Sequence, residues 1–184
     1  MSLEYTEAAP DPRYPVGKFN PPAPGPLPEG ELAYAMSCIA ELPSQLRNAV
    51  DGLGTDQINT PYRVGGWTVR QLISHVADSH MMAFLRVRLA LTEDWPTIIA
   101  YNEKAFAELH DSLAAPVEWS LELIESLHAR WVMMLQSLDD AQWQRGFVHP
   151  ERGSQTIEHA TLMYAWHCRH HLAHITHMRA AKDW

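Results

Sequence analysis

Hydrophobic residues recur every three or four positions along most of this chain, which is the spacing of amphipathic helices that bury one face. The first such stretch covers residues 29–53. Its apolar positions are Leu32, Met36, Ile39, Leu42, Leu46 and Val50. Thr68 and Gln71 form a T-x-x-Q capping box, so a second helix is predicted to begin there and to end near Leu91.

Two more long helices are predicted in the C-terminal half of the chain. Residues 117–138 are rich in Leu, Glu, Trp and Met and fit a third helix. After the polar turn HPERGSQ, Thr156 is the expected N-cap of a last helix that ends near Ala181. No stretch sustains the alternation of apolar and polar residues that indicates a β-strand. The predicted fold class is therefore all-α.

Four amphipathic segments of this length predict a four-helix bundle around one core. Residues 92–116, between the second and third helices, are too many for a simple hairpin, and a short helix is expected over residues 102–109. We therefore predict one crossover connection that leaves neighbouring helices parallel.

The N-terminal region differs in composition from the rest of the chain. Eight of the 13 prolines lie within residues 1–28, where fixed φ angles and missing N–H donors exclude a regular helix. A flexible tail is one interpretation. Tyr14, Val16 and Phe19 favour instead an extended arm that lies on the domain surface. The predicted organisation is this Pro-rich arm followed by the bundle over residues 29–184.

Composition and charge limit the classes of partner. The 184 residues, 46% of them hydrophobic, suffice for one domain with a core. The net charge of −8 repels phosphate and acidic lipid, so neither nucleic acid nor a membrane is an expected partner. No apolar run approaches about 18 residues, and no signal peptide is visible. We expect a soluble, cytoplasmic, full-length protein.

Histidine is the unusual residue here, with 11 copies in total and six of them in the predicted last helix. On a wheel of about 100° per residue, three of these six fall on or beside the core face and three point to solvent or a partner. The inward residues are His167, His171 and His174, and the outward ones are His159, His170 and His177.

His167 and His171 stand four positions apart, so their rings can converge on one metal ion from one helix face. Cys168 follows His167 where a zinc protease of the HExxH type has its glutamate, and that class is therefore excluded. A third ligand must come from another helix. The second helix offers His75 and His80, and its periodicity places His80 inward without deciding which of the two would bind metal.

Several motifs resemble one known family. They are DPRYPVGKF, TPYRVGGWTVRQLISHVADSH, ALTEDWPTI, LHARW and YAWHCRHHLAHI. In this order and at matching spacing they are similar to the YfiT-type subgroup of the DinB-like superfamily. Members of that subgroup carry the name metal-dependent hydrolase, and one is described as a bacillithiol transferase. The resemblance extends from about Asp11 to Ile175.

The resemblance implies a four-helix bundle that holds one divalent metal ion per chain, with zinc expected and nickel or a similar ion as alternatives. The residues that match the family's metal ligands are His75, His167 and His171. The resemblance thus favours His75, whereas the helical wheel favours His80. His80, His170 and His174 are then expected to support the site, form an interface or pack in the core. Cys168 points about 100° away from His167 and is expected in the core.

Three imidazole ligands leave an open coordination position, which is typical of a catalytic metal. An ion there can activate a bound thiol or a bound water. Our first interpretation is an S-transferase that conjugates a low-molecular-weight, bacillithiol-like thiol to an electrophile. The alternative is a metal-dependent hydrolase with a metal-bound water nucleophile. A third interpretation is a non-enzymatic stress or binding module that the metal stabilises.

Other residues bear on the expected substrate and partners. Asp78 and Glu158 are candidate acids or bases, although neither is well placed relative to the histidines. Arg63, Arg130 and Arg169 could form a wall that binds an anionic small-molecule substrate. Surplus apolar positions on the second helix, and the family resemblance, predict a homodimer.

Overall fold

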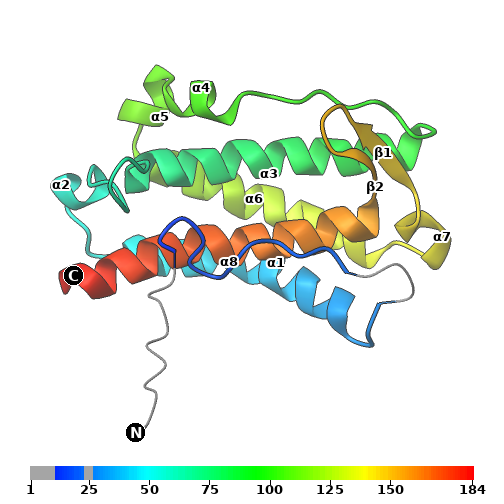
Figure 1. The fold of residues 1–184 in the computed structure, drawn as a ribbon, viewed down its shortest axis with the longest axis horizontal. Coiled ribbons are helices and arrows are strands. Elements are labelled where there is room, and N and C mark those ends of the chain that lie inside the picture. The colour runs from blue at the N-terminus through cyan, green and yellow to red at the C-terminus, as the bar shows by residue number, and fades with distance from the viewer. Residues whose placement is uncertain (1–10, 23–26) are drawn as a thin grey trace, which may run out of the picture.

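The computed structural model describes residues 11–22 and 27–184, and four long helices dominate it (Figure 1). They are α1 (Glu31–Val50), α3 (Val69–Thr92), α6 (Val117–Gln136) and α8 (Ile157–Lys182). Each lies within a few residues of a predicted helix. The prediction of a helical four-helix bundle is confirmed, with one small two-stranded sheet added to it.

The order of the helices around the bundle differs from their order in the chain. α1 packs against α8 and α6, and α3 packs against the same two helices, so successive helices α1 and α3 lie diagonally. α3 and α6 run in one direction, and α1 and α8 in the opposite one (Figure 1). The connection over residues 93–116 therefore returns the chain along the bundle and joins two parallel neighbours. This is the predicted crossover.

The crossover differs in detail from the prediction. Instead of one short helix over residues 102–109, it contains α4 (Glu103–Ala107) and α5 (His110–Ala114). Asn102 begins α4, because its Oδ1 accepts a hydrogen bond from the amide of Ala105 at 3.1 Å. The extended backbone of Leu109 then separates the two helices.

The polar stretch at residues 149–155 is part of a β-hairpin and is not a simple turn. β1 (Gly146–His149) pairs antiparallel with β2 (Gly153–Thr156). Each strand has four residues, which is too short for an alternating pattern to be visible in the sequence. A side chain at Gly146 would collide with the backbone of the facing strand and with the ring of Trp95. The remaining short helices are α2 (Thr55–Ile58) and α7 (Asp140–Trp143).

Side-chain caps fix where α3 and α8 begin. The hydroxyl of Thr68 accepts from the amide of Gln71 at 3.2 Å, and the side chain of Gln71 accepts in return from the amide of Thr68. Thr156 caps α8 in the same way, accepting from the amide of His159. None of the described helices combines the length and apolar character needed to cross a lipid bilayer.

Residues 11–22 lie along α8 (Figure 1). The indole nitrogen of Trp166 donates to the carbonyl of Gly17 at 3.0 Å, and the ring of Phe19 packs edge-on against His159. Gly17 has a φ of 77°, a conformation that favours glycine. The rest of the predicted arm, residues 1–10 and 23–26, lies outside the described residues.

Candidate metal centre

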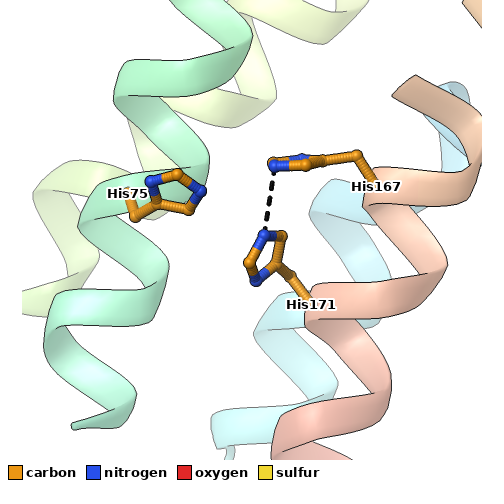
Figure 2. A group of neighbouring side chains, drawn as sticks. All are labelled: His75, His167 and His171. Carbon is orange, nitrogen blue, oxygen red and sulfur yellow. Dashed lines mark hydrogen bonds between the residues drawn. The ribbon is translucent and has the colours of Figure 1, made fainter. Parts of the chain in front are cut away.

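Three histidines from two helices meet between α3 and α8 (Figure 2). His75 comes from the second turn of α3, and His167 and His171 come from successive turns of α8. One ring nitrogen of each lies within 4.8 Å of those of the other two. The antiparallel packing of α3 on α8 thus brings together the three residues that the family resemblance implies as ligands.

The spacing of these nitrogens fits a divalent metal ion. Nε2 of His167 lies 3.1 Å from Nε2 of His171, and their ring planes are inclined by 68°. Two imidazole nitrogens at this separation, each about 2.0–2.1 Å from a shared ion, subtend an angle of about 100°. The ring of His75 faces the pair, with centroids 5.4 Å from His167 and 4.9 Å from His171. Imidazole donors suit zinc, nickel and similar ions.

The environment keeps the three rings neutral, which is the form that binds a metal. Burial, together with a smaller effect of the nearby His170, lowers the pKa of His75 to about 4. Burial also holds the pKa values of His167 and His171 well below the ordinary histidine value, with neighbouring histidines adding to the effect. All three rings therefore offer lone pairs at neutral pH.

The structure places His75 and His80 in different surroundings. His80 is completely buried, as the helical wheel predicts, but it lies deeper in the bundle than His75. Its Nε2 is 2.9 Å from Nδ1 of His167, on the far edge of that ring from His171. Periodicity therefore identified the more buried histidine correctly. It could not show that His75, against the ring of Trp67, faces the other two rings.

A second histidine group adjoins the first along α8. His170, His171 and His174 also have ring nitrogens within 4.8 Å of one another, and Nε2 of His170 lies 3.2 Å from Nε2 of His174. The wheel places His170 toward solvent or a partner, and in the folded chain it does not face solvent. Trp166 stacks on its ring at 4.6 Å and Tyr14 of the N-terminal segment covers it, so the side chain is buried.

The three-histidine group borders a cavity of about 470 Å³. Aromatic side chains form much of the wall, among them Tyr62, Trp67, Tyr101, Tyr164 and Trp166. Burial raises the pKa of Tyr101 to about 12, so its hydroxyl keeps its proton and can donate. The volume suits a small organic molecule.

Arginines give this cavity a cationic wall, but only one of the three predicted arginines belongs to it. Arg63 lines the cavity. Arg130 and Arg169 lie elsewhere, over the rings of Phe84 and Tyr34. The lining residues that carry positive charge are Arg13, Arg63, Arg86, Lys104 and Arg152, against Glu103 and Glu151.

Two of these arginines have unsatisfied polar atoms. Nε of Arg63 and Nε of Arg86 are buried and have no hydrogen-bond partner among the described residues. Arg86 is itself buried and donates from Nη2 to the carbonyl of Ile99 at 3.1 Å, but no described carboxylate pairs with it. A buried, unpaired guanidinium on a cavity wall is typical of a site that takes an anion.

The predicted acids and the cysteine lie away from this group. Asp78 is half-buried, and burial, with Asp111 nearby, raises its pKa to about 6, but it is not among the lining residues described. Glu158 accepts a hydrogen bond from Gln144. Cys168 packs in the hydrophobic core, as expected, and burial raises the pKa of its thiol well above the usual value.

The fold and this site together define a class of protein: a four-helix bundle with a three-histidine centre beside a cationic cavity. The chain belongs to the DinB superfamily, whose family model matches residues 39–175.

Individual relatives resemble the chain over nearly its full length. It is 47% identical over 174 residues to proteins of Bacillus mycoides (strain KBAB4) and Bacillus cereus (strain 03BB102), each named "putative metal-dependent hydrolase". These matches cover 95% of this chain and 99% of each relative. The solved structure of YfiT from Bacillus subtilis superposes with a TM-score of 0.90 at 41% identity. The superposition covers 94% of this chain and 98% of the YfiT chain. That protein is described as "a probable metal-dependent hydrolase with an unusual four-helix bundle topology".

Proposed function

We propose that this chain binds one divalent metal ion through His75, His167 and His171. Zinc is the expected ion, and nickel is the alternative. Three observations support this: the 3.1 Å spacing of two ring nitrogens, the third ring that faces them, and burial that keeps all three rings neutral. No described carboxylate or thiolate joins the group, so a coordination position is left for substrate.

The first candidate activity is transfer of a low-molecular-weight thiol to an electrophile. A divalent ion in such a site, when bound, lowers the pKa of a coordinated thiol or water and so supplies a nucleophile at neutral pH. In thiol transfer, sulfur forms a bond to the electrophilic carbon, the leaving group departs with its electron pair, and the thiol proton passes to solvent. This reaction needs no separate base, and none of the described carboxylates lies within the histidine group.

The cavity wall indicates that the substrate carries negative charge. Arg63 and Arg86 line the cavity, and the buried Nε atom of each has no hydrogen-bond partner in the described part of the chain. Burying the guanidinium of Arg86 away from water costs free energy unless an anion compensates its charge. The single observation that carries the proposal of a carboxylate-bearing thiol is buried Arg86, which no carboxylate of the described residues pairs with.

Metal-dependent hydrolysis is the second candidate, and the names of the relatives support it. Here water would replace the thiol as nucleophile. Tyr101, whose pKa of about 12 keeps its hydroxyl protonated, is the cavity residue suited to donate a hydrogen bond to a leaving group.

One experiment distinguishes these activities. The metal-loaded protein is incubated with an alkyl halide and either mercaptosuccinate or mercaptoethanol, and separately with activated esters and amides in the absence of thiol. We expect conjugation that depends on the metal and prefers mercaptosuccinate. Ester or amide turnover without thiol would favour the hydrolase. An ion that resists chelators, with neither activity, would favour the structural module.

Arg86 provides a second test within the same assay. In Arg86→Gln we expect the KM for the anionic thiol to rise about tenfold or more, because a hydrogen bond to a charged group is worth about 1.5–3 kcal/mol. The KM for the neutral thiol should change little. Arg130→Gln, which removes an exposed arginine outside the cavity, is the matched control and should behave as the unmodified protein.

A further inference from the structure

A chain of hydrogen-bonded histidines crosses the bundle core behind the metal centre. It begins at the carbonyl of Ile39 on α1, which lies 2.6 Å from Nδ1 of His128 on α6. Nε2 of His128 is 2.8 Å from Nδ1 of His80 on α3. Nε2 of His80 is 2.9 Å from Nδ1 of His167 on α8. Each of the four long helices therefore contributes one member.

The carbonyl at one end fixes the positions of the protons along this chain. A carbonyl oxygen only accepts, so Nδ1 of His128 must carry a proton. In a neutral ring Nε2 of His128 is then an acceptor, and the proton between it and His80 belongs to Nδ1 of His80. By the same argument His167 carries its proton on Nδ1. Its Nε2 is left with a lone pair, directed at Nε2 of His171.

Pro43 explains why the carbonyl of Ile39 is available. In an α-helix this carbonyl would accept from the amide of residue 43, but proline has no N–H. α1 nevertheless continues through Pro43. The carbonyl of Ile39 is thus left without its helical partner inside the core, and His128 supplies the missing donor.

Packing prevents the two inner rings from turning over. His80 is completely buried and His128 is 1% exposed, so almost none of the surface of either ring is open to water. The ring of Trp131 packs edge-on against both, and Tyr164 packs edge-on against His80. A flipped ring would leave N–H groups unpaired in this apolar surrounding, which is costly.

We propose that His80 and His128 are positioning residues that hold His167 in its Nδ1–H tautomer and so present Nε2 of His167 to the metal. Free neutral histidine in water prefers the other tautomer, with the proton on Nε2. The bundle therefore keeps this ring in its less common form. The tautomer assignment concerns the metal-free protein, whereas its effect on affinity rests on the metal site proposed above.

Nitrogen-15 NMR of the metal-free protein tests the tautomers directly. We expect His128, His80 and His167 each to show a protonated Nδ1 and an unprotonated Nε2. His177 is exposed on the same helix as His167 and should show the mixture typical of free histidine. A proton on Nε2 of His167 in the metal-free protein would overturn the proposal, and this holds even if no metal binds.

Two substitutions of His128 test the effect on metal affinity. The amide oxygen of His128→Gln can still accept from Nδ1 of His80, whereas His128→Leu cannot. Losing the hydrogen-bond partner of a ligating histidine typically weakens metal binding by about 10–100-fold, and His128 holds that partner, His80, in place. We expect His128→Leu to weaken zinc or nickel binding at least tenfold and to mix the tautomers of His167. His128→Gln should stay within about threefold of the unmodified protein.

Ile124→Ala is the packing control, because Ile124 is fully buried one turn before His128 on the same helix and outside the histidine chain. It should destabilise the bundle without changing metal affinity. Unchanged affinity in His128→Leu, or an equal loss in Ile124→Ala, would refute the positioning role. If His128→Leu does not fold, the NMR assignment in the unmodified protein decides. If the unmodified protein binds no metal, the proposed function fails while the tautomers are still measured.

Discussion

His167 and His171 illustrate how much one proton decides at this site. Their Nε2 atoms lie 3.1 Å apart, so in the metal-free protein one of them must donate to the other. The proton on Nδ1 of His167 assigns that role to His171, whose Nδ1 is buried with no partner among the described residues. Metal binding would therefore require His171, unlike His167, to move its proton.

Removing His171 should abolish tight metal binding. We expect His171→Ala to weaken zinc or nickel affinity at least tenfold, because two of three ligands do not hold the ion firmly. The change is measured by competition with a chelator and by metal content after gel filtration. His177→Ala, which removes an exposed histidine from the same helix, is the control. Full stoichiometric binding in His171→Ala would exclude it as a ligand.

The buried histidines also predict how the stability of the metal-free protein depends on pH. Burial lowers the pKa of His128 to about 4, whereas the unfolded chain titrates near the ordinary value of 6.5. The unfolded state therefore binds more protons between these values, and stability falls as the pH drops from 6.5 toward 4. Each such histidine contributes about 1.4 kcal/mol per pH unit.

His128→Gln should reduce the change of unfolding free energy with pH by about 1.4 kcal/mol per pH unit, since it removes one of the titrating groups. Urea denaturation at several pH values between 7 and 5 measures it. The control is His177→Gln, because His177 is exposed in the folded chain. The same slope in the unmodified protein and in His128→Gln would contradict the prediction.

At the scale of elements, α1 shows how a helix accommodates an interior proline. Replacing a proline inside a helix with alanine typically restores about 3 kcal/mol, part of it from the recovered hydrogen bond. Here the carbonyl of Ile39 already has His128 as donor. We expect Pro43→Ala to increase the free energy of unfolding by clearly less than this amount, measured by urea denaturation. A gain of the full 3 kcal/mol would mean that the bond to His128 contributes nothing.

The crossover between α3 and α6 determines how α3 lies against α8, and the site forms between these two helices. The crossover lays α3 parallel to α6 and antiparallel to α8. His75 near the start of α3 then lies level with His167 and His171 in the middle of α8 (Figure 2). The caps at Thr68 and Thr156 fix where the two helices begin, and the packing of α3 on α8 sets the register between the rings.

At the scale of the whole molecule, we propose that two copies of this chain associate. The sequence left His80 as a candidate interface residue. In the structure His80 is part of the core, so it cannot belong to an interface. Met81 and Leu85, one turn apart on α3, are nevertheless 42% and 49% exposed. We expect sedimentation at micromolar concentration to give twice the chain mass of 20.9 kDa.

Met81→Lys with Leu85→Glu should convert this dimer into a monomer while the helical content is unchanged. Arg88→Glu on the same helix, also exposed, is the control that introduces a new charged residue without removing an apolar one. A monomer in the unmodified protein at micromolar concentration would show that the exposed apolar residues of α3 do not form an interface.

Helix positions and the bundle could be predicted from the sequence because they depend on local features. The apolar spacing, the capping box at Thr68 and the cap at Thr156 are all contained within a few neighbouring residues. The pair His167 and His171 was also visible, because a spacing of four places two rings on one helix face. His128 had a signal too: it continues the apolar stripe of Ile124 and Trp131.

Only the tertiary structure decided which groups meet across helices. Periodicity places His80 inward, but it cannot show that His75 faces His167, because that depends on the rotation of α3 against α8. The sequence gives no sign that Arg86 joins the cavity wall or that Arg130 does not. Nor does it show that the carbonyl freed by Pro43 meets His128, since residues 39 and 128 come together only when α1 packs against α6. Local pattern thus determined the helices and one face of the site, and long-range packing determined its chemistry.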